Sequence, residues 1–164
     1  MKTVREWLDE YSSNHANPVN RRFHFVCIPP IAFSVVCALK AIPAGAWINS
    51  AWLNPASVSI VAALAYYAWL SWRLAIGLVV ILGAFYAGAL AIAAAAGSNL
   101  IWAALAIFVV GWIGQFIGHH IEGTRPSFFK DLQFLLIGPL WELAHVYRRL
   151  GIPVDGRAAG ARSA

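Results

Sequence analysis

Residues 74–121 read LAIGLVVILGAFYAGALAIAAAAGSNLIWAALAIFVVGWIGQFIGHHI and contain no Asp, Glu, Lys or Arg. About 20 consecutive apolar residues are enough to cross the hydrocarbon core of a bilayer. This stretch is therefore long enough for two membrane-spanning helices. We expect one over 74–96 and the other over 100–121.

Two more apolar stretches precede it, over 23–42 and 51–72, and between Arg22 and Glu122 the only charged residues are Lys40 and Arg73. The whole chain is 60% hydrophobic and 12% charged, about half the charged fraction of a soluble domain. The predicted fold class is an all-α integral membrane protein with four transmembrane helices. We expect a single domain over residues 1–150, followed by a flexible tail over 151–164.

Shorter helical segments are expected on both sides of the four spans. Residues 3–12 have apolar positions at helical spacing, Val4, Trp7, Leu8 and Tyr11, which predicts an N-terminal amphipathic helix on the membrane surface or on the bundle. Residues 128–150 are apolar but interrupted by Gly138-Pro139. We expect a C-terminal interfacial or re-entrant helical segment there, not a fifth span.

The basic residues indicate the orientation in the membrane. An even number of spans puts both termini on one side, together with all but one of the flanking basic residues: Lys2, Arg5, Arg21, Arg22, Arg73, Arg125, Lys130, Arg148 and Arg149. Only Lys40 opposes them, so the positive-inside rule favours cytoplasmic termini. Residues 1–22 contain no signal peptide pattern, which fits a bacterial inner membrane. The net charge of +5 is assigned to topology and lipid headgroups, and no nucleic-acid partner is expected.

All five histidines lie at the two edges of the apolar middle. His15 and His24 stand at its start, and His119, His120 and His145 stand at or beyond its end. Four spans would place His24 and His119 in the same leaflet. We therefore predict one polar site at the cytoplasmic face. Imidazole and carboxylate ligands suit Fe(II), zinc or manganese.

Polar residues near His119 extend this candidate site. His119 and Glu122 are three residues apart and share a helix face, whereas His120 points about 100° away. Gln115 falls at membrane depth, where a polar side chain is costly and usually faces a cavity or a partner. We therefore include Gln115 among the residues expected to face the site.

Two other groups are candidates for supporting roles. Glu142 and His145 repeat the three-residue spacing, either as ligands or as a pair that orients a ligand by a hydrogen bond. Arg125 and Arg21 could bind a carboxylate bidentately, and Asn20 stands beside Arg21. The alternative role of these arginines is in topology and headgroup contact, which is slightly favoured for the neighbouring Arg22.

The residues alone leave three functions open. An iron site would favour oxidation with O2. A zinc site would favour hydrolysis of a lipid ester or amide, with Glu122 as general base. The third possibility is a non-enzymatic membrane protein that packs helices or binds lipid, whose histidines only solvate the interface.

Two motifs resemble a known family. The first is a Y…H…NP.N…H…IP opening, formed by Tyr11, His15, Asn17-Pro18, Asn20, His24 and Ile28-Pro29. The second lies in residues 111–141, GWIGQFIGHHIEGTRPSFFKDLQFLLIGPLW, as a Q-F-x-G-H…E…P…GP core. Together they resemble the Mpo1-like family, whose fungal member is a 2-hydroxy fatty acid dioxygenase. The resemblance covers residues 3–150.

The resemblance implies an Fe(II) enzyme that uses O2 to shorten a long-chain 2-hydroxy fatty acid by one carbon. By carry-over, the iron ligands would be His15, His24 and His119, with His120 as a further candidate. Glu122 matches the motif acid and, with Arg125, is assigned a catalytic role. Substrate-binding roles are assigned to Arg21, Asn20 and Gln115, and supporting roles to Glu142 and His145. Membrane lipid is the expected surrounding, and the oligomeric state is open.

Overall fold

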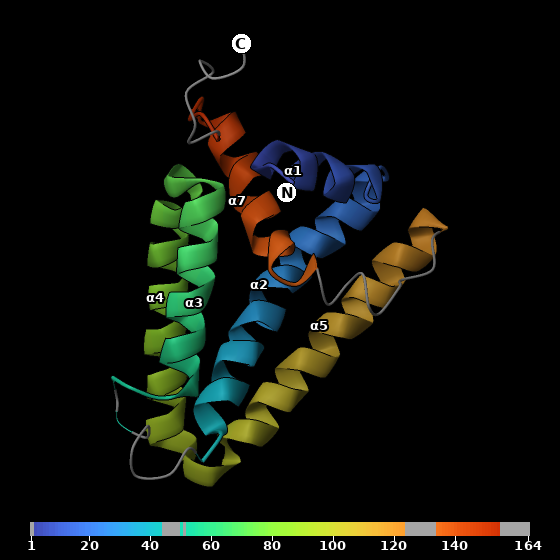
Figure 1. Cartoon of the computed structure of the whole chain (residues 1–164). Coiled ribbons are helices and arrows are strands. Elements are labelled where there is room, and N and C mark those ends of the chain that lie inside the picture. Colours follow the sequence, from blue (N-terminus) through green and yellow to red (C-terminus); the bar gives the residue numbers. More distant parts are fainter. Residues whose placement is uncertain (1, 44–49, 51, 124–133, 155–164) are drawn as a thin grey trace.

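The computed structural model describes residues 2–43, 50, 52–123 and 134–154, and this part of the chain is helical without strands (Figure 1). The predicted all-α class is therefore confirmed. The elements are α1 Val4–Ser13, α2 Pro18–Ala41, α3 Pro55–Leu70, α4 Trp72–Ala96, the short 3-10 helix η1 Gly97–Asn99, α5 Leu100–Glu122 and α7 Ile137–Arg149.

Local sequence sets where these helices begin and end. Asn17 caps α2 by accepting a hydrogen bond from the Val19 amide, and Asn54 caps α3 in the same way. Ser71 ends α3 and caps α4. Gly97 ends α4 with a φ of 54°, a conformation that glycine adopts without steric cost. Asn, Ser and Gly are the residues that favour these positions.

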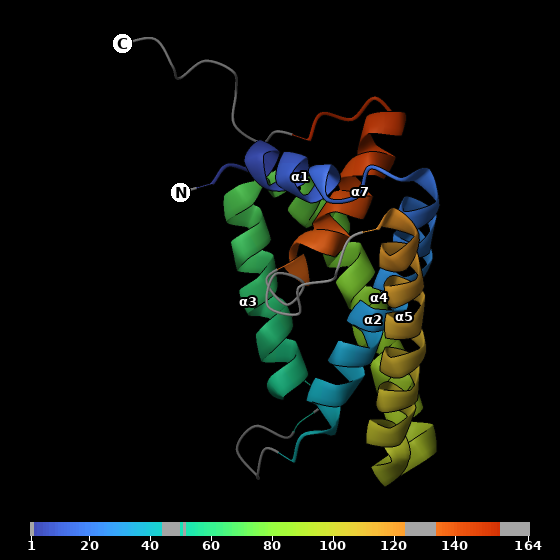
Figure 2. The same ribbon diagram turned by 90° about the vertical axis from the view of Figure 1, so that its right-hand side faces the viewer.

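The four long helices α2, α3, α4 and α5 run alternately in opposite directions, and α1 and α7 lie at one end of them (Figures 1 and 2). The start of α2 and the end of α5 meet at this same end. The largest fully buried apolar side chains gather there too, from α1, α4 and α7: Leu8, Leu74, Leu78, Ile137, Leu140 and Trp141. This core fixes α1 and α7 against the bundle.

Close packing between α2 and α5 depends on three glycines of α5. Gly111, Gly114 and Gly118 lie on one helix face, and a Cβ atom added to Gly114 or Gly118 would collide with Cys27 or Asn20 of α2. Small residues at such spacing let two helix backbones approach closely. The sequence analysis did not predict this stripe, although the spacing in GWIGQFIG is visible in the sequence.

The number of membrane spans is only partly supported. Two segments are long and apolar enough to cross a membrane, α2 and the 51-residue stretch Trp72–Glu122, which η1 divides into α4 and α5. The span predicted over 51–72 is a shorter apolar helix of 16 residues, because caps at Asn54 and Ser71 limit it. The predicted count of four is therefore not confirmed.

The C-terminal segment predicted over 128–150 is seen as α7. Gly138 and Pro139 lie in its first turn, where proline is tolerated because the first amide groups of a helix have no acceptor inside the helix. Residues 128–133 lie outside the described residues, as does the predicted tail from residue 155 onward.

Candidate metal centre

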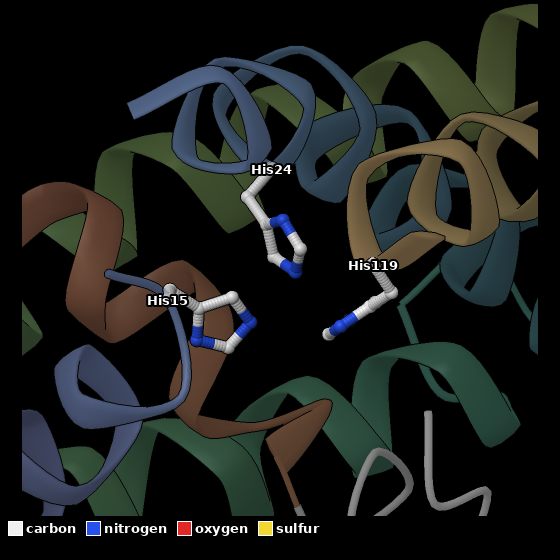
Figure 3. A group of neighbouring side chains, drawn as sticks. All are labelled: His15, His24 and His119. Carbon is white, nitrogen blue, oxygen red and sulfur yellow. The ribbon is translucent and has the colours of Figure 1, made fainter. Parts of the chain in front are cut away.

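Three buried imidazoles converge at the end of the bundle where α1 and α7 lie (Figure 3). His15 comes from the turn between α1 and α2, His24 from α2 and His119 from α5. One ligand atom from each lies within 4.8 Å of the others. The ring centroids are 4.2 Å apart for His15 and His24, 5.0 Å for His24 and His119, and 5.4 Å for His15 and His119.

Backbone carbonyl groups fix the orientation of two of these rings. The Nδ1 atom of His15 lies 2.6 Å from the Tyr11 carbonyl oxygen, and that of His24 lies 3.0 Å from the Asn20 carbonyl oxygen. A carbonyl oxygen only accepts, so each Nδ1 carries the hydrogen and each Nε2 keeps its lone pair. A hydrogen bond on one ring nitrogen that leaves the other for the metal is typical of histidine ligands.

The protein environment favours the neutral form of His15. Burial lowers the pKa of its imidazole, and the neighbouring His119 lowers it further, against opposing contributions from the Tyr11 carbonyl and Glu122. A neutral imidazole is the form that binds a metal ion. Three imidazoles facing one another make a donor set that fits iron or zinc.

Aromatic side chains hold His15 in place. The Tyr11 ring stacks on it with a centroid distance of 4.3 Å and an interplanar angle of 15°. Trp141 of α7 lies 5.1 Å from Tyr11 and 6.1 Å from His15, and its Nε1 donates to Ser12 Oγ at 2.8 Å. The apolar stripe of α1 and the helix α7 thus form the wall behind this ligand.

Glu122, at the end of α5, binds the start of α2. Its Oε1 accepts from the Ala16 and Asn17 amides, each at 2.9 Å, and its Oε2 accepts from Asn20 Nδ2 at 2.9 Å. A carboxylate at a helix N-terminus is favoured by the free amides and the helix dipole. Glu122 therefore fixes the turn that carries His15.

The Mpo1-like family, described as 2-hydroxy-palmitic acid dioxygenase Mpo1-like, matches residues 1–150. The chain belongs to this family. The resemblance found in the two motifs is therefore confirmed. No curated protein and no solved structure matches the chain.

The other predicted site residues of this Mpo1-like chain differ in their burial and in their place in the fold. Gln115 is buried on α5, four residues before His119. His120 is exposed and is not part of the three-histidine group. Arg21 is exposed at the start of α2. Arg125 lies outside the described residues.

Glu142 and His145 lie on α7 and are not part of the three-histidine group. The His145 ring contacts the Trp141 ring with a centroid distance of 4.2 Å and an interplanar angle of 57°, and its Nδ1 lies 3.0 Å from the Trp141 carbonyl oxygen. Burial raises the pKa of the Glu142 carboxyl to about 9, and its buried Oε1 has no hydrogen-bond partner. Trp141 contacts both His145 and His15, with ring centroid distances of 4.2 Å and 6.1 Å.

Trp112 is a residue that the sequence analysis missed. Its indole Nε1 and the Nε2 atom of Gln115 are both buried and have no hydrogen-bond partner among the described residues. Trp112, Gln115 and His119 stand at spacings of three and four residues, so they share one face of α5. That spacing could have predicted Trp112 once Gln115 and His119 were assigned to the site.

Proposed function

We propose that this Mpo1-like chain is an Fe(II)-dependent membrane dioxygenase that converts a long-chain 2-hydroxy fatty acid into the fatty acid one carbon shorter. The reaction balances with one O2: the 2-hydroxy acid loses four electrons and becomes the shorter acid and CO2, and O2 is reduced to water and to the added carboxyl oxygen. The main support is the group of three buried imidazoles within 4.8 Å of one another, in a family described as a 2-hydroxy-palmitic acid dioxygenase.

In this proposal, His15, His24 and His119 hold the iron. Ferrous iron on such a set supplies redox chemistry with O2 and has positions left for other ligands. Glu122 keeps the turn bearing His15 in register with α5, because its two oxygens accept from Ala16, Asn17 and Asn20. Arg21, exposed near the start of α2, is proposed to attract the carboxylate of the substrate towards the site, and Arg125 is proposed to share this role.

A membrane location fits the outer surface of the bundle. Large apolar side chains are exposed along α3, α4 and α5, among them Val61, Trp69, Val79, Val80, Val109, Val110, Ile113 and Phe116. We propose that α2, α3, α4 and α5 all cross the membrane, with the histidines at the cytoplasmic face of a bacterial inner membrane. A fatty acid would then keep its chain in the bilayer and its head group at the histidines.

The test is the metal content of anaerobically purified protein, combined with O2 consumption on adding 2-hydroxypalmitic acid. We expect about one iron per chain and O2 uptake that requires the substrate. His119→Ala should lose the iron and the uptake, while His120→Ala, a change at the exposed neighbouring residue, should keep both. Iron and full activity in the His119→Ala protein would contradict the proposal.

The same donor set also suits zinc, so a zinc-dependent lipid hydrolase is the second candidate. Glu122 would be its general base, but both oxygens of Glu122 accept hydrogen bonds from the start of α2. Tightly bound zinc, ester hydrolysis and no O2 uptake would favour this alternative. A chain without metal that tolerates alanine at all three histidines would favour a non-enzymatic membrane protein.

A further inference from the structure

A small pocket lies directly beside the three-histidine group. His24 and His119 form part of its wall, and Trp112 and Gln115 line it as well. The rest of the lining is largely apolar and includes Ile28, Ile31 and Leu135. Its volume is about 40 Å³, above the roughly 10–15 Å³ that a cavity needs to hold one water molecule. The pocket is therefore large enough for a small polar group.

Two hydrogen-bond donors of the residues that line this pocket have no partner among the described residues. Gln115 is only 6% exposed, and neither its Nε2 atom nor the Nε1 atom of Trp112 has an acceptor. Buried polar groups are nearly always hydrogen-bonded, and at membrane depth an unpaired one is costly. The indole N–H can only donate, so the missing partner is an acceptor.

We infer that Trp112 Nε1 and Gln115 Nε2 bind the carboxylate of a fatty acid in this pocket. A carboxylate only accepts hydrogen bonds and has two oxygens, one for each donor. His24 and His119 lie on the same pocket, so the carbon next to the carboxylate is held beside the metal ligands. The apolar part of the lining faces the start of the acyl chain. The identity of the acid rests on the proposed function, whereas the recognition of a carboxylate rests on the two donors.

The experiment measures binding by calorimetry under anaerobic conditions, where no turnover occurs. The two ligands are 2-hydroxypalmitic acid and 1,2-hexadecanediol, which has the same chain and 2-hydroxyl but a neutral primary alcohol in place of the carboxylate. The variants are Trp112→Phe, which keeps an aromatic side chain but is smaller and lacks the donor, and Gln115→Leu, which removes the amide. Trp102→Phe, at an exposed residue of the same helix, is the matched control.

We expect the unaltered protein to bind the acid more tightly than the diol. Because a hydrogen bond to a charged group contributes more than one between neutral groups, each variant should weaken acid binding about 10-fold. Diol binding should weaken less, because a neutral hydroxyl is a weaker acceptor than a carboxylate. The iron content, which reports on the histidines, should stay unchanged. The Trp102→Phe protein should behave like the unaltered one. Each variant tests the inference independently. If one of them fails to fold, the acid and diol affinities of the other still test it.

Equal loss of acid and diol binding would show a general packing effect and overturn the inference, as would unchanged acid binding in both variants. Failure of the proposed function gives a different result. In that case the unaltered protein would prefer the acid and the variants would lose this preference, but no O2 would be consumed when air is admitted.

Discussion

The helix pair α3 and α4 differs from the pair α2 and α5 in whether its buried polar side chains have hydrogen-bond partners. Along α3 and α4, polar side chains find protein partners: Tyr67 Oη donates to the Leu136 carbonyl at 2.8 Å, and Asn54 Nδ2 donates to Tyr86 Oη at 2.5 Å. Along α2 and α5, Asn20 Oδ1, Trp112 Nε1 and Gln115 Nε2 are buried without a partner. Among the described residues, α3 and α4 contribute no such atom.

This difference separates a scaffold from a site. A pair of helices whose buried polar side chains have hydrogen-bond partners within the protein has no free buried donor or acceptor for a ligand. A pair that keeps buried donors and acceptors unpaired loses stability, a loss that a bound metal or substrate can offset. We therefore expect changes in α3 and α4 to affect folding, and changes in α2 and α5 to affect binding as well.

The largest expected effect follows from the contact between α2 and α5. A methyl group at Gly118 would collide with the Asn20 side chain and come within 3.0 Å of Phe23 Cβ, so Gly118→Ala should lower the free energy of unfolding by about 2–3 kcal/mol. It should also reduce iron loading, because Asn20 and Glu122 are displaced. Thermal unfolding in detergent and metal analysis measure the two effects.

Gly83→Ala is the control for this change, since a methyl group there meets nothing within 4 Å. It should leave iron loading unchanged and keep or slightly raise the stability, because alanine favours a helix more than glycine does. Equal losses from both variants would mean that close packing of α2 and α5 is not what positions the site.

The next effect concerns the carboxylate that joins α5 to α2. Glu122→Gln keeps one acceptor oxygen and loses the charge, so the turn bearing His15 should be held less well. Iron affinity should fall about 10-fold, within the range seen when groups that support metal ligands are changed. Turnover of the protein saturated with iron should stay within about threefold, a margin of less than 1 kcal/mol in activation free energy. A loss of turnover of 100-fold or more at full iron occupancy would instead assign Glu122 a catalytic role.

A smaller effect should depend on pH. Burial raises the pKa of Glu142 from its ordinary 4.5 to about 9, so between these values the folded protein keeps a proton that the unfolded chain has lost. The free energy of unfolding therefore falls as pH rises through this window. Glu142→Gln should remove this slope and raise the melting temperature at pH 8 by about 3 °C or more.

Asp9→Asn, at an exposed carboxylate of α1, should keep the slope of the unaltered protein. Melting curves of all three proteins at pH 5, 7 and 9 provide the comparison. Equal changes in melting temperature from pH 7 to pH 9 in the unaltered and Glu142→Gln proteins would contradict the assignment to Glu142.

The smallest expected effect tests the scaffold pair. Tyr67→Phe removes the hydrogen bond to the Leu136 carbonyl and should cost about 1 kcal/mol of stability. Iron content and acid binding should be unchanged. If iron content fell with this variant, the division into a scaffold and a site would be wrong.

Several features of the fold could be predicted from local sequence. Runs of apolar residues predicted the helices, and capping residues such as Asn17, Asn54 and Ser71 mark where they start or stop. The all-α class and the meeting of His24 with His119 at one end were predicted correctly. The length of α3 was overestimated, because an apolar run continues past the caps that limit the helix.

The sequence by itself determined the helices, the positions of the histidines at the edges of the apolar block and membership of the Mpo1-like family. Only the tertiary structure decided that His119 and not His120 faces inward and that Glu122 binds the start of α2. The reason is that the rotation of a helix about its axis depends on its packing partners. In α5 the glycine face against α2 sets that rotation, and it thereby selects which side chains meet.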